Sequence, residues 1–171
     1  MKKVLIANRG EIARRIIRTL KKMDIRSVAI YSDADANSPH VLEADEAVHV
    51  GGSPSSESYL RQDVILNYCK ELSVDGIHPG YGFLSENAAF AKKVTDAGIT
   101  FIGPSPEAMN IMGDKLSAKQ AVKAYDVPLV PGIDQAVVDV NEAKEFAQQI
   151  GYPVLIKASA GGGGKGMRLV E

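Results

Sequence analysis

Cysteine is almost absent from this 171-residue chain, which contains only Cys69. A single thiol excludes an internal disulfide bond and favours a reducing compartment, so we expect a cytoplasmic protein. Cys69 lies in a segment with the periodicity of a helix, and no neighbouring base that would activate its thiol is evident. We therefore expect Cys69 to be buried and unreactive, and not a catalytic nucleophile.

An excess of charge is missing too, because 20 lysines and arginines stand against 21 aspartates and glutamates and the formal net charge is −1. Proteins that bind nucleic acid usually carry a basic excess, so we expect no nucleic-acid partner. No apolar run approaches the ~20 residues of a membrane span. The apolar run at residues 4–7 is too short for a signal peptide, so we expect no membrane partner.

Short apolar runs alternate with longer amphipathic segments through the first part of the chain. We predict strands at residues 4–7, 27–31, 47–50, 76–78 and 100–102. Predicted helices lie between them at 11–22, 61–72 and 88–97. The first helix places Ile12, Ile16, Ile17 and Leu20 on one face. Such alternation is typical of the α/β fold class, with a parallel sheet that helices cover on both faces.

The pattern changes after Ile102, where the strict alternation of strands and helices ends. Further helices are predicted at residues 106–112, 115–125 and 141–150. Two apolar stretches, 152–159 and 167–170, then flank a run of glycines and predict a β-hairpin. We therefore predict two domains, at residues 1–112 and 113–171, the second of which is too short to close a core of its own.

The segment Ala7–Ala13, with the sequence ANRGEIA, joins the first predicted strand to the first predicted helix. A helix N-terminus offers free backbone N–H groups and a partial positive charge, which suit an anion. A dinucleotide-binding fold would show G-x-G-x-x-G here, and only Gly10 is present, so the pattern argues against NAD. The alternative is a tight turn in which Gly10 relieves backbone strain and Asn8 or Arg9 fixes a loop.

Residues 78–87, with the sequence HPGYGFLSEN, follow the fourth predicted strand at the end where ligands collect in open α/β sheets. The two glycines let a ligand or another backbone approach closely. We predict Ser85 as the N-cap of the next helix, with Glu86 near its positive end. The alternative is a rigid structural turn, in which His78 is a hydrogen-bonded interior histidine and not a catalyst.

The glycine run at residues 161–166, GGGGKG, lies between two predicted strands. Consecutive glycines can fold over a polyphosphate because no side chain obstructs their N–H groups. Lys165 within the run and Lys157 before it add positive charge suited to phosphate. The run is not a P-loop, since no Gly-Lys-Ser/Thr sequence opens a helix after it. A flexible linker is the alternative.

A further lysine, Lys115, stands in the segment MGDKLSAK at residues 112–119. Gly113 and Asp114 can end one helix and cap the next, which places Lys115 in the first helical turn. A cation at that position is unfavourable to the helix dipole, which hints at a ligand. A solvated lysine is the alternative.

Together these segments resemble the biotin carboxylases, whether a separate subunit or the first domain of an acetyl-CoA, propionyl-CoA or pyruvate carboxylase. The resemblance covers essentially the whole chain and is most specific at residues 6–13, 78–87, 112–115 and 157–166. It implies an ATP-grasp ligase, with a Rossmann-like pre-ATP-grasp domain at residues 1–112 and the beginning of the ATP-grasp domain, including its lid, at 113–171. Such an enzyme uses ATP and Mg²⁺ to activate bicarbonate as carboxyphosphate, and then carboxylates biotin.

The resemblance also implies partners and site residues. The biotin is held by a carrier protein or domain, and a carboxyltransferase uses the carboxylated product. The positions that match nucleotide-binding residues are Lys115, Lys157, Gly162, Gly163, Gly164, Lys165 and Gly166. Tyr81, Gly82 and Glu86 match positions on the biotin side of the cleft. The family often has arginine at the position of Lys165, so the charge is kept but the bidentate geometry is not.

The family's magnesium ligands, general base and bicarbonate-binding arginines correspond to positions after Glu171. We therefore expect no catalytic or metal-binding residue within these 171 residues, and no turnover of ATP by them alone. The alternatives are another ATP-grasp ligase, such as a carbamoyl-phosphate synthetase, or a non-catalytic folding or dimerisation module.

Two surfaces are also expected to matter for assembly. The resemblance implies a homodimer, with residues 11–22 and their Arg14, Arg15 and Arg18 near the contact; a solvated basic face is the alternative. The hairpin is expected to have open edges and an uncovered apolar face.

Overall fold

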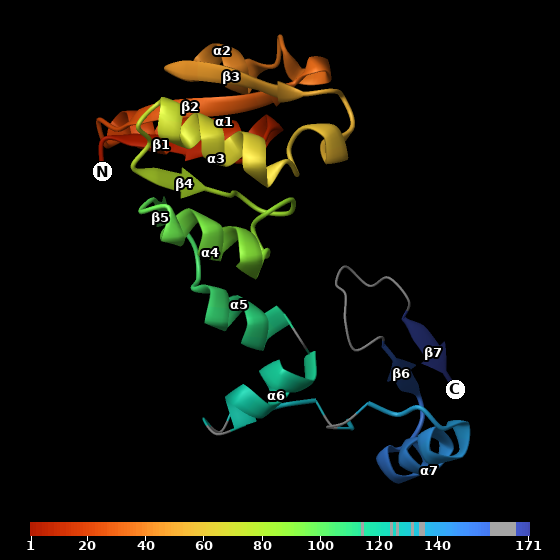
Figure 1. Cartoon of the computed structure of the whole chain (residues 1–171). Coiled ribbons are helices and arrows are strands. Elements are labelled where there is room, and N and C mark those ends of the chain that lie inside the picture. The colour runs from red at the N-terminus through yellow and green to blue at the C-terminus, as the bar shows by residue number, and fades with distance from the viewer. Residues whose placement is uncertain (114, 124, 126, 131, 134–135, 158–166) are drawn as a thin grey trace. The chain divides into compact units, whose positions relative to one another are not determined.

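The computed structural model describes residues 1–113, 115–123, 125, 127–130, 132–133, 136–157 and 167–171 (Figure 1). The chain divides into two compact units, Met1–Pro106 and Glu107–Glu171. The domain boundary placed after residue 112 stays a prediction. None of the helices in the described ranges has the length and hydropathy needed to cross a bilayer.

The first unit is built on a five-stranded parallel sheet with the strand order β3-β2-β1-β4-β5. Its strands are β1 (Lys3–Ile6), β2 (Arg26–Ser32), β3 (Glu46–Gly51), β4 (Gly76–His78) and β5 (Thr100–Phe101). β1 is central, and its residue Ile6 pairs with Ala29 of β2 and with His78 of β4. The α/β fold class and all five predicted strands are therefore confirmed.

Alternate residues of β1 supply the two apolar layers on either side of the sheet, as the period of two in a strand requires. Val4 and Ile6 pack in one layer with the apolar face of α1 (Gly10–Lys22). Leu5 packs in the other layer with side chains of α3 (Gln62–Glu71) and α4 (Ala88–Asp96). Burial on both faces explains why the strand is apolar throughout.

The three predicted helices of this unit agree with α1, α3 and α4 to within one residue at each end. Three further short elements were not predicted from the sequence. They are η1 (Asp33–Asp35), α2 (Pro39–Glu43) and η2 (Ser55–Glu57). Segments of three to five residues are too short to show a complete amphipathic period, so the sequence pattern does not predict them.

The prediction that Ser85 caps the helix is wrong. α4 begins at Ala88, and the side chain of Asn87 accepts a hydrogen bond of 2.8 Å from the backbone N–H of Phe90. The N–H of Ser85 instead donates to the carbonyl of Gly82 in a turn, at 2.9 Å. Serine and asparagine are both favourable N-caps, and the turn decides between them because it delays the helix by two residues.

The described residues of the second unit form helices and a two-stranded sheet. They are α5 (Pro106–Gly113), α6 (Lys115–Lys123), α7 (Val140–Ile150), β6 (Val154–Ile156) and β7 (Arg168–Val170). β6 and β7 pair antiparallel, which confirms the predicted hairpin. Leu155 is 47% exposed and Leu169 63% exposed, so the apolar face of this hairpin is uncovered in the chain, as expected.

Candidate functional site

The carboxyl ends of β1 and β4 lie side by side at the centre of the parallel sheet. The chain runs from β1 to β2 and β3 on one side and then crosses to β4 on the other side, so the strand order reverses between β1 and β4. The backbone N–H of Ala7 donates to the carbonyl of His78 across this junction, at 2.9 Å. Ligands of open α/β sheets bind beyond the carboxyl ends of strands at such a reversal.

Asn8 ties the two loops at this junction together. It is only 4% exposed, although its side chain is polar. The Nδ2 amide donates to the carbonyls of Pro79 and Tyr81, at 2.8 Å and 2.7 Å. Its Oδ1 accepts the backbone N–H of Arg9 at 2.9 Å. The loop after β4 is therefore held by a buried side chain from the loop after β1. The same hydrogen bonds satisfy the polar groups of Asn8, as burial of a polar side chain requires.

The two glycines of this loop have different roles. Gly80 has a φ of +65°, and a Cβ there would lie 2.8 Å from Asn8 Nδ2, so both the backbone and the packing require glycine. Gly82 also has a positive φ, +66°, but nothing lies within 4 Å of the position of its Cβ. The backbone at Gly82 therefore leaves room for an approaching molecule, as we expect of a ligand-binding loop.

Tyr81, between the two glycines, projects a largely exposed side chain. It is 62% exposed, and its hydroxyl donates to Oε1 of Glu11 in the first turn of α1, at 2.5 Å. The hydrogen bond to the Glu11 carboxylate raises the pKa of Tyr81. Glu86, on the same loop, is also exposed. The structure thus brings the predicted residues Tyr81, Gly82 and Glu86 together on one surface loop.

Arg9 pairs with a buried carboxylate and does not stand free at the helix N-terminus. Its Nη2 donates to Oδ1 of Asp35 at 2.6 Å, and its Nε donates to Oδ2. The guanidinium of Arg9 holds the pKa of the Asp35 carboxyl well below its usual range. Asn8 holds the loop after β4, and Arg9 holds Asp35. Both side chains therefore fix loops, as in the alternative of a tight turn that the sequence left open for residues 7–13.

His78 is also a structural residue, and it lies half-buried at the end of β4. Its Nδ1 accepts the backbone N–H of Gly80 at 3.0 Å, and burial lowers the pKa of its imidazole. This agrees with the alternative of an interior, hydrogen-bonded histidine. The loop is therefore a rigid turn and an exposed surface at once, and the two alternatives for it are compatible.

The predicted nucleotide-binding residues belong to the second unit and are only partly described. Lys157 directly follows β6 and is exposed. Lys115 begins α6, but its side chain lies outside the described part of the structure. Gly162, Gly163, Gly164, Lys165 and Gly166 also lie outside the described residues. Their role in nucleotide binding stays a prediction.

Sequence reasoning missed two residues of the first unit that support the loop after β4. Asp35 and Tyr59 are 3% and 2% exposed and form a hydrogen bond with one another. They are separated by 24 residues, and no local pattern links them. The only sequence signal is an aspartate shortly after a predicted strand, which is too common to single out Asp35.

Comparison with known proteins places the chain in a family. Residues 1–109 match the family described as Biotin carboxylase, N-terminal domain, and residues 114–171 match the family described as Carbamoyl-phosphate synthase L chain, ATP binding domain. A biotin carboxylase of Halalkalibacterium halodurans is 59% identical over 170 residues, which are 99% of this chain and 38% of that protein.

Solved structures agree with this assignment. A biotin carboxylase–beta-gamma-ATP complex from Campylobacter jejuni has a TM-score of 0.95 and 49% identity, and covers 99% of this chain and 38% of its own. The biotin carboxylase domain dimer of a Hydrogenobacter thermophilus 2-oxoglutarate carboxylase, in complex with MgADP, ADP and bicarbonate, has a TM-score of 0.91 and 50% identity, with 98% of this chain and 37% of its own covered.

The chain thus spans less than two fifths of the length of these relatives, and it matches them along nearly all of its own length. Its first unit has a parallel sheet, and Asn8 joins the loops after β1 and β4 at the centre of that sheet. The chain belongs to the biotin carboxylase family, and it corresponds to the N-terminal part of the family members that it matches.

Proposed function

We propose that the whole protein is an ATP-dependent ligase that carboxylates biotin on a carrier protein or domain. The observation that carries this proposal is the surface loop at residues 79–87, held by Asn8 at the centre of the sheet, in a chain 59% identical to a biotin carboxylase. The solved 2-oxoglutarate carboxylase domain with MgADP and bicarbonate supports the same nucleotide and the same one-carbon substrate.

In the proposed reaction, a bicarbonate oxygen attacks the γ-phosphorus of ATP, and the bond from that phosphorus to the β–γ bridging oxygen breaks to release ADP. The resulting carboxyphosphate releases CO₂ and phosphate. The ureido nitrogen of biotin then bonds to the carbon of CO₂, and its proton passes to the released phosphate. Such a phosphoryl transfer depends on charge neutralisation and alignment. Water must be kept away, because it would hydrolyse the carboxyphosphate.

Within this chain we assign the loop residues Tyr81, Gly82 and Glu86 to the biotin side of the site. The open backbone at Gly82 and the exposed ring of Tyr81 support this assignment, since a ligand can approach both. The hydroxyl of Tyr81 is held by Glu11, which limits the rotamers of the ring before biotin arrives.

We assign the nucleotide to the second unit. Lys115, Lys157 and Lys165 supply positive charge to its phosphates, and the N–H groups of Gly162, Gly163, Gly164 and Gly166 supply hydrogen bonds. The match of residues 114–171 to an ATP binding domain supports this proposal. Mg²⁺ would neutralise phosphate charge, and we place its ligands in the rest of the enzyme, at the positions that the resemblance to the biotin carboxylases implies.

The proposal also includes partners. We propose a biotin carrier, a carboxyltransferase and a second copy of the protein. The described dimer of the 2-oxoglutarate carboxylase domain supports a homodimer. On α1, Arg14 pairs with Glu43 of α2 and Arg15 donates to the hydroxyl of Thr19. We propose that Arg14, Arg15 and Arg18 lie near the dimer contact. We propose a reducing, cytoplasmic location, which the single cysteine supports.

The test measures ATP hydrolysis by the whole protein with bicarbonate and free biotin. We expect hydrolysis that requires bicarbonate, rises with biotin and yields carboxybiotin. Lys157→Ala should lower it by at least about tenfold, because a phosphate loses a charged partner. Lys144→Ala, which removes an exposed lysine of α7, should not change it. Formation of carbamoyl phosphate from ammonia, without carboxybiotin, would instead support the carbamoyl-phosphate synthetase alternative.

A further inference from the structure

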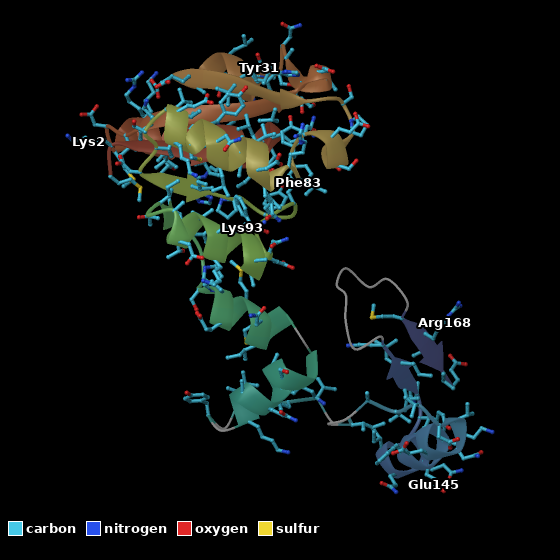
Figure 2. All side chains as sticks on the ribbon, in the orientation of Figure 1. Lys2, Tyr31, Phe83, Lys93, Glu145 and Arg168 are labelled. Atoms are coloured by element: carbon cyan, nitrogen blue, oxygen red, sulfur yellow. The ribbon has the colours of Figure 1, made fainter. Side chains whose placement is uncertain are left out.

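The loop at residues 79–87 has a second support besides Asn8. The ring of Phe83 stacks on the ring of Tyr59, with their centroids 5.1 Å apart and their planes 8° from parallel. Phe83 is labelled at the edge of the first unit in Figure 2, where its side chain is 38% exposed. Its backbone has a φ of +43°, which is uncommon for any residue other than glycine. Such a conformation persists where surrounding contacts hold it.

Tyr59 cannot easily move away from Phe83, because its hydroxyl is fixed as well. Tyr59 is 2% exposed. Its hydroxyl donates to Oδ2 of Asp35 at 2.5 Å and accepts the backbone N–H of Ser32 at 3.1 Å. A displacement of the ring would leave buried polar groups of Asp35 and Ser32 without this partner, which is unfavourable.

Asp35 is in turn held from two other elements. Its carboxylate accepts hydrogen bonds from the guanidinium of Arg9, in the loop after β1, and from Oγ of Ser38 at 3.0 Å. A continuous set of contacts therefore runs from Arg9 through Asp35 and Tyr59 to Phe83. Each contact joins residues from a different loop at the carboxyl ends of the strands, so the set fixes the loops relative to one another.

We propose that Phe83, Tyr59 and Asp35 are positioning residues for biotin, which hold the backbone of residues 81–86 in its binding conformation without touching the substrate. This inference rests on the proposed function, in which that loop lines the biotin side of the site. Phe83 lies within the loop, so a shift of its ring displaces the residues on either side. Displacements of about 1 Å are enough to weaken binding and catalysis strongly.

The experiment uses the whole protein and the substitution Phe83→Leu, which keeps an apolar side chain but removes the aromatic stack. We expect the KM for free biotin to rise by about tenfold, while the KM for ATP stays unchanged. Phe83→Tyr keeps the ring and should restore the biotin KM. A general loss of folded protein would lower the apparent kcat and leave the KM values for biotin and for ATP unchanged, so it would not produce this split.

Phe101→Leu is the matched control. Phe101 forms an edge-to-face pair with Phe90, with centroids 6.2 Å apart and planes at 84°, in the same unit but outside residues 79–87. Its replacement also removes one aromatic pair and should lower the melting temperature without changing the biotin KM. An equal rise of the biotin KM in both variants would overturn the proposal.

Hydrogen–deuterium exchange gives a readout that does not depend on activity. In Phe83→Leu, the amides of residues 79–87 should exchange faster, while those of α4 should not change. If the wild-type protein does not carboxylate biotin, the proposed function fails, and the exchange still decides whether Phe83 holds the loop. Unchanged exchange in a folded variant would overturn the inference. If Phe83→Leu does not fold, Tyr59→Phe is measured in its place, because it loses only the hydrogen bonds of the hydroxyl.

Discussion

The side-chain amide of Asn8 fills the space that a side chain at Gly80 would need. A Cβ at Gly80 would lie 2.8 Å from Nδ2 of Asn8, and this amide donates to the carbonyls on both sides of Gly80. The close approach joins the loops that follow β1 and β4. Glycine at this position is therefore a requirement of packing as well as of the backbone.

Gly80→Ala should consequently destabilise the protein more than an alanine at another glycine with positive φ. Gly98 has a φ of +76° with nothing within 4 Å of its Cβ position, so Gly98→Ala tests the backbone alone. We expect Gly98→Ala to lower the free energy of unfolding by about 1 kcal/mol. Gly80→Ala should lower it by about 2–3 kcal/mol, because it also displaces a hydrogen-bonded amide. If urea denaturation shows that the two variants lose the same free energy of unfolding, the packing of Asn8 against Gly80 does not matter for stability.

His40 should make the stability of the first unit depend on pH. It is fully buried, its Nε2 lies 3.3 Å from the carbonyl of Ile30, and burial lowers its pKa from the ordinary value of 6.5. The charged groups around it are Arg9, Asp35 and Glu43. The unfolded chain binds a proton more readily than the folded one, so this contribution to stability is complete above pH 6.5 and is lost as the pH falls below it.

The measurement is urea denaturation at several pH values for the wild type and for His40→Gln, which keeps a polar group near Ile30 but does not titrate. The wild type should lose more stability than the variant between neutral pH and about pH 5. His78 has a pKa lowered in the same direction by burial, so part of the dependence should remain in the variant. Identical pH dependence of the two proteins would show that His40 is not responsible.

Cys69 should not react with thiol reagents in the folded protein. It is 1% exposed, and burial raises the pKa of its thiol to about 12, so almost no thiolate is present at neutral pH. We expect no reaction with a disulfide reagent under native conditions and one thiol per chain after unfolding. Rapid labelling of the folded chain would contradict the burial of this side chain.

The 171-residue chain on its own should not hydrolyse ATP in a bicarbonate-dependent reaction. The resemblance to the biotin carboxylases implies that the magnesium ligands, the general base and the bicarbonate-binding arginines belong to the rest of the enzyme, and lysines alone align an in-line phosphoryl transfer poorly. We expect its rate to equal that of the same chain with Lys157→Ala. Turnover above that control would show that the chain contains more of the catalytic machinery than we propose.

Elements with a strong repeating pattern were predictable from the sequence. The five strands follow short apolar runs, and the helices α1, α3 and α4 follow amphipathic segments that are long enough to show a helical period. The end of a helix depends on finer differences. Ser85 and Asn87 are both suitable caps, and only the turn that joins Gly82 to Ser85 places the start of α4 after Asn87.

The candidate site divides in the same way. Tyr81, Gly82 and Glu86 are predictable because they are neighbours in a distinctive segment of the chain, and the structure places them on one loop. The supports of that loop are not predictable. Asn8 is 73 residues away from Tyr81, and Asp35 is 24 residues away from Tyr59, so nothing local connects either pair.

The amino-acid sequence by itself determined the α/β class, the order of strands and helices, and the segments that resemble a biotin carboxylase, because each depends on residues close together in the chain. Tertiary structure alone decided that Asn8 would meet Gly80, and that Asp35, Tyr59 and Phe83 would stand in contact. The physical reason is the strand order β3-β2-β1-β4-β5, which brings the carboxyl ends of distant strands to one edge of the sheet. Buried polar side chains there find their partners across loops, and not along them.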